Sequence, residues 1–139
     1  LGADRVVAED EVAALLDEAR EAPIDLVIET VGGTADTIHT AVAACRPGGT
    51  VCVLGVYTGS PTFPAVRVLM KEIRILGSFV YGRAGAQADF DIALDILRRR
   101  STTLGPTVIT HRVPLADIDA AFRTATDKTS GAIKVTVEP

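Results

Sequence analysis

The sequence contains no tryptophan, and its aromatic residues are limited to four phenylalanines and two tyrosines. A hydrophobic core must therefore be built mainly from valine, isoleucine, leucine and alanine. No apolar run approaches the roughly 20 residues that a membrane-spanning helix needs, and no secretory signal peptide is visible. The sequence also lacks a G-x-G-x-x-G loop, which excludes the usual phosphate-binding turn of nucleotide-binding domains.

Positive charge is scarce as well, because 14 lysines and arginines stand against 18 aspartates and glutamates, for a net charge of −4. This balance argues against nucleic acid or an anionic membrane surface as a partner. The two cysteines, Cys45 and Cys52, lack the spacing of metal ligands. We expect both to pack in the core of a protein from the reducing cytoplasm.

The remaining composition is that of a globular protein, with 47% hydrophobic and 23% charged residues. A chain of 139 residues is long enough for one domain with a sizeable core. Because it begins with Leu1 rather than methionine, we interpret it as part of a longer protein.

A β-α-β unit is predicted in the first half of the chain. Residues 24–29 form a short apolar run typical of a buried strand, and Gly32-Gly33 follow it. Residues 34–45 have apolar side chains at helical spacing, and a turn at Pro47-Gly48-Gly49 leads to a second strand at residues 51–54. Strands joined in this way pair in parallel, forming the kind of scaffold on which nucleotide cofactors bind.

Similar patterns predict the other elements. We expect strands at residues 5–8, 73–81, 107–113 and 132–137, and helices at residues 10–21, 65–71, 89–100 and 115–126. A boundary is expected at residues 101–106, where a charged helix gives way to Thr, Gly and Pro. The predicted fold class is therefore α/β: a partial doubly wound parallel sheet followed by a separate β-α-β segment.

Several short stretches occur in an order and spacing that resemble a known family. They are Leu1-Gly2-Ala3-Asp4-Arg5-Val6-Val7, residues 25–33, Arg46-Pro47-Gly48-Gly49-Thr50-Val51, Leu54-Gly55-Val56, Lys71-Glu72-Ile73, Leu76-Gly77-Ser78, Ile109-Thr110-His111-Arg112, Pro114-Leu115 and Gly131-Ala132-Ile133-Lys134-Val135. Together they resemble the C-terminal half of the zinc-type medium-chain alcohol dehydrogenases, and most of all the sorbitol, threonine and butanediol dehydrogenases.

The resemblance implies a Rossmann-like sheet with strand order 3-2-1-4-5-6, of which this chain would supply strands three to six. Strand three would be residues 5–8. Strands one and two, with the phosphate-binding glycines and the acidic ribose ligand, would lie outside the chain, as would the zinc ligands. Residues 24–29 would then form an exposed edge, so the isolated chain is expected to pair with another copy, rearrange or aggregate.

The same resemblance divides the chain into three parts. Residues 1–82 would be the C-terminal portion of the dinucleotide-binding domain, residues 83–103 a connecting helix, and residues 104–139 a returning segment of the catalytic domain. Related dehydrogenases form dimers by pairing strand six across a two-fold axis, so the strand from Ile73 to Tyr81 is the expected homo-oligomer contact.

Cofactor contacts are implied at the ends of three strands. Thr30, Val31 and Gly32 would lie by the adenosine half of NAD or NADP, and Leu54, Gly55, Val56, Ser78, Phe79 and Val80 by the nicotinamide. Without a Cβ atom, Gly32 and Gly55 either let the backbone approach a flat ring closely or simply permit turns. Lys134 matches a basic residue that reaches the cofactor pyrophosphate.

Tyr81 is a candidate substrate contact. Sorbitol-type enzymes carry Phe-Arg-Tyr where this chain has Phe79-Val80-Tyr81. Because an arginine suits hydroxyl-rich substrates, its replacement by Val80 favours a less polar secondary alcohol or ketone. His39 and His111 are interpreted as structural or solvated side chains, and no catalytic residue or metal ligand is expected in this chain.

The resemblance therefore implies a cofactor-binding segment of an NAD(P)-dependent, zinc-dependent alcohol or polyol dehydrogenase, inactive by itself. Its expected partners are a nicotinamide dinucleotide and a small alcohol or ketone, with no nucleic acid and no membrane. Three alternatives remain open: a zinc-free quinone or enoyl reductase of the same superfamily, a methyltransferase, and a non-catalytic oligomerisation module.

Overall fold

The computed structural model describes residues 2–139 and divides them into two compact units. One unit is Asp4–Gly82, and the other consists of Arg83–Pro139 with residues 2–3. No helix among the described residues is both long and apolar enough to cross a membrane.

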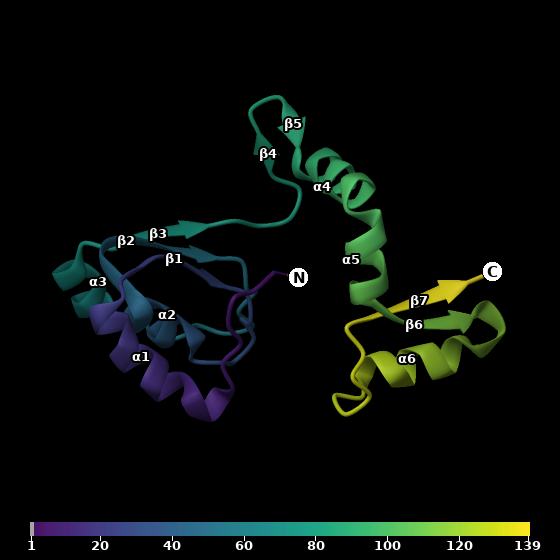
Figure 1. Cartoon of the computed structure of the whole chain (residues 1–139), viewed down its shortest axis with the longest axis horizontal. Helices are drawn as coiled ribbons and strands as arrows, with labels where there is room; N and C mark the ends of the chain where they lie inside the picture. The colour runs from purple at the N-terminus through teal and green to yellow at the C-terminus, as the bar shows by residue number, and fades with distance from the viewer. Residues whose placement is uncertain (1) are drawn as a thin grey trace. The chain divides into compact units, whose positions relative to one another are not determined.

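The first unit is built on a parallel sheet of three strands, in the order β1 (Ile24–Glu29), β2 (Cys45–Val53) and β3 (Arg74–Gly77). Helix α2 (Thr37–Ala44) connects β1 to β2, and α3 (Ala65–Lys71) lies between β2 and β3. Both helices lie on the same side of the sheet as α1 (Val12–Glu21), as Figure 1 shows. This arrangement confirms the α/β class and the parallel β-α-β unit.

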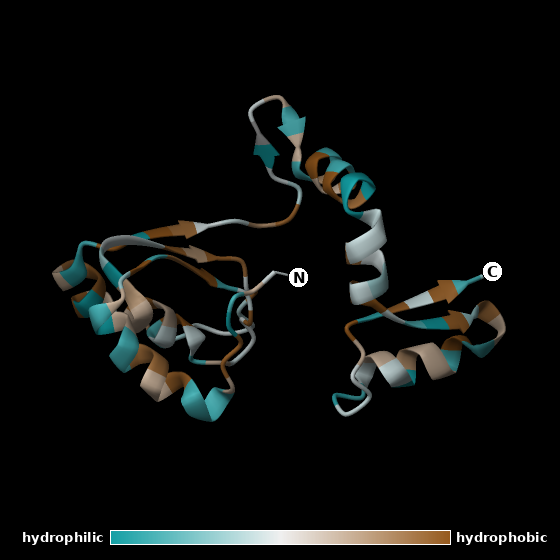
Figure 2. Ribbon diagram, viewed as in Figure 1, coloured by the Kyte–Doolittle hydropathy of each residue, from teal (hydrophilic) through white to brown (hydrophobic). Residues whose placement is uncertain are grey.

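The core of this unit lies between α2 and the sheet. Its buried members are Ile38, Ala41, Val42, Cys45, Val51 and Ile73. The helical members recur at the spacing that places side chains on one face of a helix, so the apolar pattern predicted this packing correctly. Leu26, Ile28 and Leu76 are exposed. Figure 2 shows the hydrophobic stretches of these strands in brown.

Two predicted strands differ from the structure. Residues 5–8 are not a strand, because β1 pairs only with β2 and the described part of the chain offers no other parallel neighbour. Arg5 instead forms an ion pair with Glu18 of α1, with 2.6 Å between Nη1 and Oε2. The strand predicted at residues 73–81 ends at Gly77, since Gly77 pairs with Val53, the last residue of β2. Beyond that point no partner strand continues.

The turn predicted at Pro47-Gly48-Gly49 lies inside β2. Ile24 pairs with Cys45 but Leu26 pairs with Thr50, so β2 advances five residues while β1 advances two. The predicted helix at residues 34–45 begins only at Thr37, because Gly32 and Gly33 both have positive φ and prolong the turn after β1.

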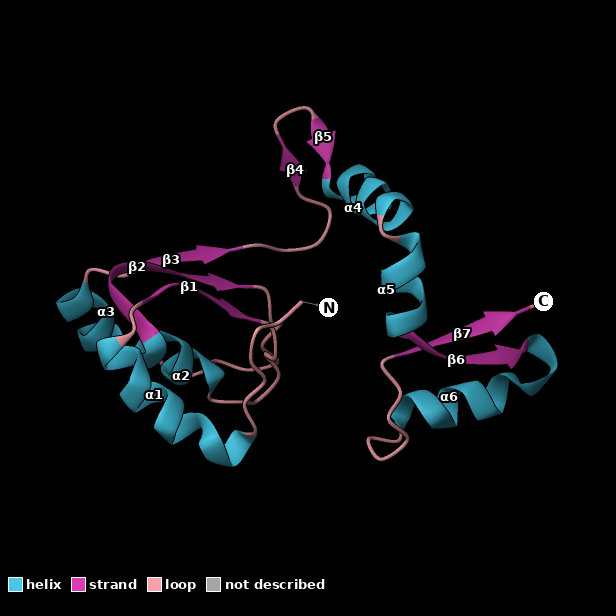
Figure 3. Cartoon of the chain, viewed as in Figure 1, coloured by secondary structure: helices cyan, strands magenta, loops and turns pink. Residues whose placement is uncertain are grey.

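The second unit contains a short antiparallel hairpin, β4 (Arg83–Ala84) with β5 (Gln87–Ala88), followed by α4 (Asp89–Arg99) and α5 (Ser101–Val108). Strands β6 (Ile109–Pro114) and β7 (Lys134–Glu138) pair in parallel and are connected by α6 (Ile118–Thr126), as Figure 3 shows. The β-α-β segment was thus predicted correctly.

The strand start expected at residue 107 is wrong, because α5 occupies residues 101–108. The two compact units divide between Gly82 and Arg83, and the boundary expected at residues 101–106 falls inside the second of them. The amides of Thr103 and Leu104 donate to the carbonyl of Arg100 at 3.0 and 2.8 Å. The hydroxyl of Thr107 donates to the carbonyl of Thr103 at 2.6 Å. These bonds support a helix despite Pro106 in its interior.

Lys71, at the end of α3, joins α3 to the end of α2. Its Nζ donates to the carbonyls of Val42, Ala43 and Cys45 at 3.2, 2.8 and 2.7 Å. Burial of the ammonium lowers the pKa of Lys71 below its ordinary value. A cation at the C-terminal end of a helix satisfies carbonyls that have no partner within the helix.

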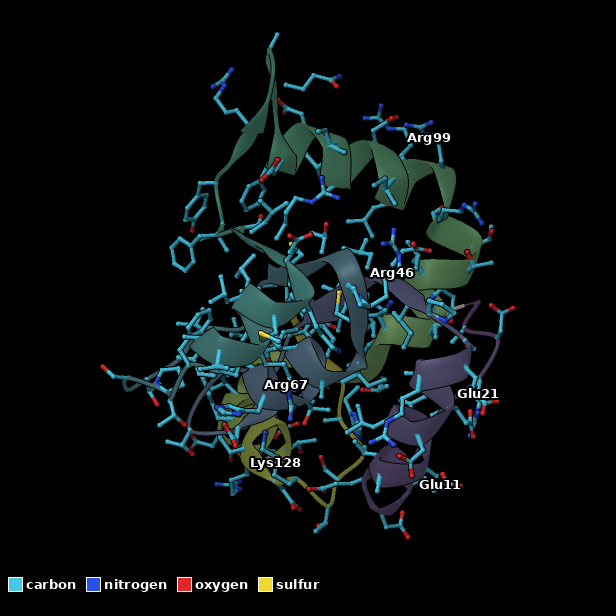
Figure 4. The ribbon with its side chains drawn as sticks, turned by 90° about the vertical axis from the view of Figure 1, so that its left-hand side faces the viewer. Glu11, Glu21, Arg46, Arg67, Arg99 and Lys128 are labelled. Atoms are coloured by element: carbon cyan, nitrogen blue, oxygen red, sulfur yellow. The ribbon has the colours of Figure 1, made fainter. Side chains whose placement is uncertain are left out.

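We predict that Lys71→Met destabilises the fold by about 2–3 kcal/mol, because the part-buried carbonyls lose their shared donor while the aliphatic stem is retained. Urea denaturation followed by circular dichroism measures this change. The matched control is Arg67→Met on the same helix, an exposed side chain labelled in Figure 4, for which we expect a change within about 0.5 kcal/mol. Equal midpoints for the two variants would contradict the capping role.

Candidate functional site

The three strands of the first unit end side by side. Glu29, Val53 and Gly77 are neighbours in register, and each is the last residue of its strand. The turns that follow therefore start from the same edge of the sheet, the edge at which open parallel sheets bind ligands. These turns are residues 30–32, 54–56 and 78–80, the segments that carry the cofactor contacts predicted from the sequence.

Backbone hydrogen bonds connect the turns. The amides of Leu54 and Gly55 both donate to the carbonyl of Glu29, at 2.8 and 3.1 Å. The amide of Gly33 donates to the carbonyl of Val56 at 2.8 Å. The first two turns thus form one connected backbone structure.

One backbone hydrogen bond connects the third turn to the end of β2. The amide of Ser78 donates to the carbonyl of Val53 at 3.0 Å. Phe79 and Val80 follow as exposed residues, and the backbone of Tyr81 has a φ of 68°. Residues 78–81 therefore form a turn at the end of β3 instead of a continuation of the strand.

The side chain of Glu29 lies inside the first turn and is almost completely buried, with only 4% of the residue exposed. Its Oε1 atom accepts hydrogen bonds from the amides of Val31 and Gly32 at 2.8 and 3.0 Å. The same oxygen accepts a bond of 2.7 Å from the hydroxyl of Thr37. The Tyr57 hydroxyl lies 3.3 Å from that of Thr37 and completes the polar group.

Sequence reasoning missed Glu29, because it treated this residue as the end of an apolar run. One signal could have revealed it: an acidic residue closing a buried strand immediately before a glycine-rich turn needs donors from that turn. The amides of residues 31 and 32 supply them.

The environment of Glu29 favours the carboxylate. Burial by itself raises the pKa of Glu29, but hydrogen bonds from the Gly32 amide, the Thr37 hydroxyl, the Val31 amide and the Tyr57 hydroxyl outweigh it, so the pKa lies below its ordinary value. The second oxygen, Oε2, is buried and has no hydrogen-bond partner among the described residues.

The two glycines of these turns pack against protein atoms. A Cβ atom on Gly32 would lie 2.5 Å from the amide nitrogen of Val56. A Cβ atom on Gly55 would lie 2.4 Å from Oε2 of Glu29 and 2.5 Å from the nitrogen of Gly32. Of the two interpretations of these glycines, the contacts favour the one in which they permit the turns. The turns themselves fill that space.

The turns present an apolar surface. Val31, Leu54, Val56, Phe79 and Val80 are all exposed large hydrophobic residues. Exposed apolar side chains at the ligand-binding edge of a parallel sheet are typical of a surface that binds a flat, apolar group.

The other predicted residues lie elsewhere. Lys134 is the first residue of β7 and belongs to the other unit, where its carbonyl accepts a bond from the Thr110 hydroxyl at 3.3 Å. Nδ1 of His111 lies 3.0 Å from Oγ1 of Thr110, and Nε2 of His39 lies 3.0 Å from the carbonyl of Thr62. Both histidines thus have local partners, as a structural role requires.

In residues 2–139 no group of three or more His, Cys, Asp or Glu side chains is arranged to hold a metal ion. Cys45 is buried in the core, which confirms its predicted packing role. Cys52 is half-buried and lies outside the core cluster; both residues are free thiols.

We predict that Gly32→Ala and Gly33→Ala differ sharply in their effect on stability. Both glycines have nearly the same φ, 61° and 62°, so alanine carries the same backbone strain at each position. Nothing lies within 4 Å of a Cβ atom on Gly33, whereas one on Gly32 meets the backbone of Val56. We expect a loss of about 1 kcal/mol for Gly33→Ala and about 3–4 kcal/mol for Gly32→Ala. Chemical denaturation measures both, and similar losses would contradict the packing of turn against turn.

Comparison with known proteins identifies the family. Residues 1–99 match the family described as "Zinc-binding dehydrogenase". The chain is 30% identical over 144 residues to L-idonate 5-dehydrogenase of Vitis vinifera, covering 97% of this chain and 37% of that protein. It is 28% identical over 129 residues to sorbitol dehydrogenase of Macaca fascicularis, covering 89% of this chain and 34% of that protein.

A solved structure shares the fold. The short chain alcohol dehydrogenase RspB of Escherichia coli CFT073, complexed with NADH, superimposes with a TM-score of 0.76 at 18% identity, covering 99% of this chain and 39% of that chain. The chain thus spans 34–39% of the length of these three proteins. By its sequence and its α/β fold, the chain belongs to the zinc-binding dehydrogenase family, a family of oxidoreductases that includes alcohol and polyol dehydrogenases.

Proposed function

We propose that this chain supplies the nicotinamide-binding edge of an NAD(P)-dependent, zinc-dependent alcohol dehydrogenase. The observation that carries the proposal is the common edge at which β1, β2 and β3 end, where two turns are tied together by Glu29. The exposed apolar side chains around these turns suit a dinucleotide. The E. coli structure complexed with NADH, which shares the fold, supports the same cofactor class.

The contribution of this chain to catalysis is positioning. When bound, the nicotinamide ring supplies the carbon that accepts or donates the hydride. Residues 54–56 and 78–80 hold that half of the cofactor through backbone groups and apolar contacts, and residues 30–32 hold the adenosine half. Fixing one face of the ring toward the alcohol lowers the entropic part of the barrier. No step is assigned to zinc here, because the described residues hold no metal-binding group.

The substrate is proposed to be a secondary alcohol or the corresponding ketone. Relatives named for L-idonate and sorbitol favour a polyol. In this chain Val80 is apolar and exposed beside Tyr81, which favours a substrate with fewer hydroxyl groups. Tyr81 remains the candidate substrate contact. The free edge of β3 is the proposed contact between two copies of the enzyme.

The test of this function is cofactor titration of the complete dehydrogenase and of the 139-residue chain by itself, followed through NADH fluorescence. We expect the complete enzyme to bind the dinucleotide and oxidise secondary alcohols. The chain alone should bind no tighter than about millimolar, near −4 kcal/mol, because it supplies only one wall of the site. Failure of the complete enzyme to bind either NADH or NADPH would overturn the proposal.

Lys134 provides a second test. We predict that Lys134→Ala in the complete enzyme weakens cofactor binding about 10- to 100-fold, since a hydrogen bond to a charged phosphate contributes about 1.5–3 kcal/mol. The control is Lys128→Ala, an exposed lysine of the same unit labelled in Figure 4, which should leave binding unchanged. Wild-type affinity in Lys134→Ala would remove this lysine from the site.

A further inference from the structure

We propose that Glu29 is a positioning residue of the cofactor site: its buried carboxylate fixes the turn after β1 against the turn after β2. The inference rests on the proposed function, since these are the turns assigned to the two halves of the dinucleotide. Glu29 itself touches neither the cofactor nor the alcohol. It acts through residues 30–32 and 54–56.

Glu29 reaches both turns by different atoms. Its carbonyl oxygen accepts hydrogen bonds from the amides of Leu54 and Gly55, which belong to the second turn. Its carboxylate accepts hydrogen bonds from the amides of Val31 and Gly32, which belong to the first turn. Four amides from two turns are thus held by one residue. A substitution at this position removes the side-chain half of the connection and leaves the backbone half intact.

The carboxylate also touches the second turn directly. Its Oε2 atom lies where a Cβ atom on Gly55 would be only 2.4 Å away, so the oxygen sits against the backbone of that glycine. The backbone of Gly32 packs close to the same position, since its nitrogen and Cα would lie 2.5 and 2.9 Å from that Cβ atom. The separation of the two turns is therefore set by three tightly packed groups: one carboxylate and two glycines.

The carboxylate of Glu29 is held by hydrogen bonds alone, without a cation. Among the described residues no lysine, arginine or histidine forms an ion pair with Glu29. Burying an acid without a cation is costly, and apolar replacements of buried charged groups are often neutral or stabilising. One carboxylate oxygen is even left without a hydrogen bond. For Glu29 the amide donors that offset this cost come from the turn at the ligand-binding edge, so the buried charge fixes the geometry of that turn.

The test compares Glu29→Gln with Asp25→Asn in the complete dehydrogenase. Both remove one carboxylate from β1, but Asp25 is exposed at the other end of the strand and pairs with Arg46. The measurements are the dissociation constant for NADH, the single-turnover rate of hydride transfer with its deuterium isotope effect, and the thermal midpoint.

For Glu29→Gln we expect NADH to bind about tenfold more weakly, because hydrogen bonds to a neutral amide replace stronger bonds to a carboxylate. The hydride-transfer rate should fall as well, while KM for the alcohol stays near its wild-type value. Asp25→Asn should leave the NADH dissociation constant, the hydride-transfer rate and the thermal midpoint unchanged. A Glu29→Gln enzyme with a lowered thermal midpoint but wild-type NADH affinity and transfer rate would overturn the proposal, since Glu29 would then be merely structural.

A second variant covers the case in which Glu29→Gln does not fold. Thr37→Val removes one donor to the carboxylate and keeps both the charge and the backbone bonds. We expect about threefold weaker NADH binding with a smaller loss of transfer rate, and an unchanged affinity would overturn the proposal. If the wild-type enzyme binds no nicotinamide dinucleotide, it is the proposed function that fails, and this outcome is distinct from a failure at Glu29.

Discussion

The buried carboxylate at the end of β1 is the constraint on which the candidate site depends. A charged group can stay away from water only if nearby donors replace its hydration, and here the amides of the following turn and the hydroxyl of Thr37 do so. The turn must therefore curl back over the strand end. Its curvature requires positive φ at Gly32 and Gly33, and that conformation delays the start of α2 until Thr37.

The turn after β1 also determines how the rest of the first unit packs. Once α2 begins at Thr37, its apolar residues fall onto β2, where Val42 and Val51 are fully buried. Lys71 then closes the far end of α2 by binding its last carbonyls. At one end of the unit the Glu29 carboxylate accepts hydrogen bonds from backbone amides. At the other end the Lys71 ammonium donates hydrogen bonds to backbone carbonyls.

Periodicity predicted the parts of this fold that depend on burial. The inward face of α2, the parallel pairing of β1 with β2 and the β6-α6-β7 segment follow from apolar spacing and turn residues. The order β1-β2-β3 was implied by the family resemblance instead. Periodicity could not predict what depends on a partner. Residues 5–8 have strand-like composition but no neighbouring strand, and β3 ends where β2 ends.

The sequence predicted where the candidate site lies, but not which contacts hold its turns together. Strand ends in a parallel sheet share an edge, so residues 30–32, 54–56 and 78–80 could be grouped from sequence and topology. The role of Glu29 could not, because hydropathy treats the last residue of a strand as part of the run. For Gly55 the sequence left open whether the missing Cβ atom admits a ligand or permits a turn. In the structure Oε2 of Glu29 would lie 2.4 Å from that Cβ atom.

The register slip in β2 has a consequence for how this family can vary. Residues 46–49 loop away between two paired positions, Cys45 and Thr50, at the opposite end of β1 from Glu29. Because Val27 to Glu29 pair in unbroken register with Val51 to Val53, a change of length in the loop leaves those pairs in place. The last residue of the slip is nevertheless constrained, because a Cβ atom on Gly49 would lie 2.6 Å from Sγ of Cys45 and 3.0 Å from the carbonyl oxygen of Asp25. A related chain can therefore change Pro47 and Gly48 more easily than Gly49, and neither change reaches the opposite edge of the sheet.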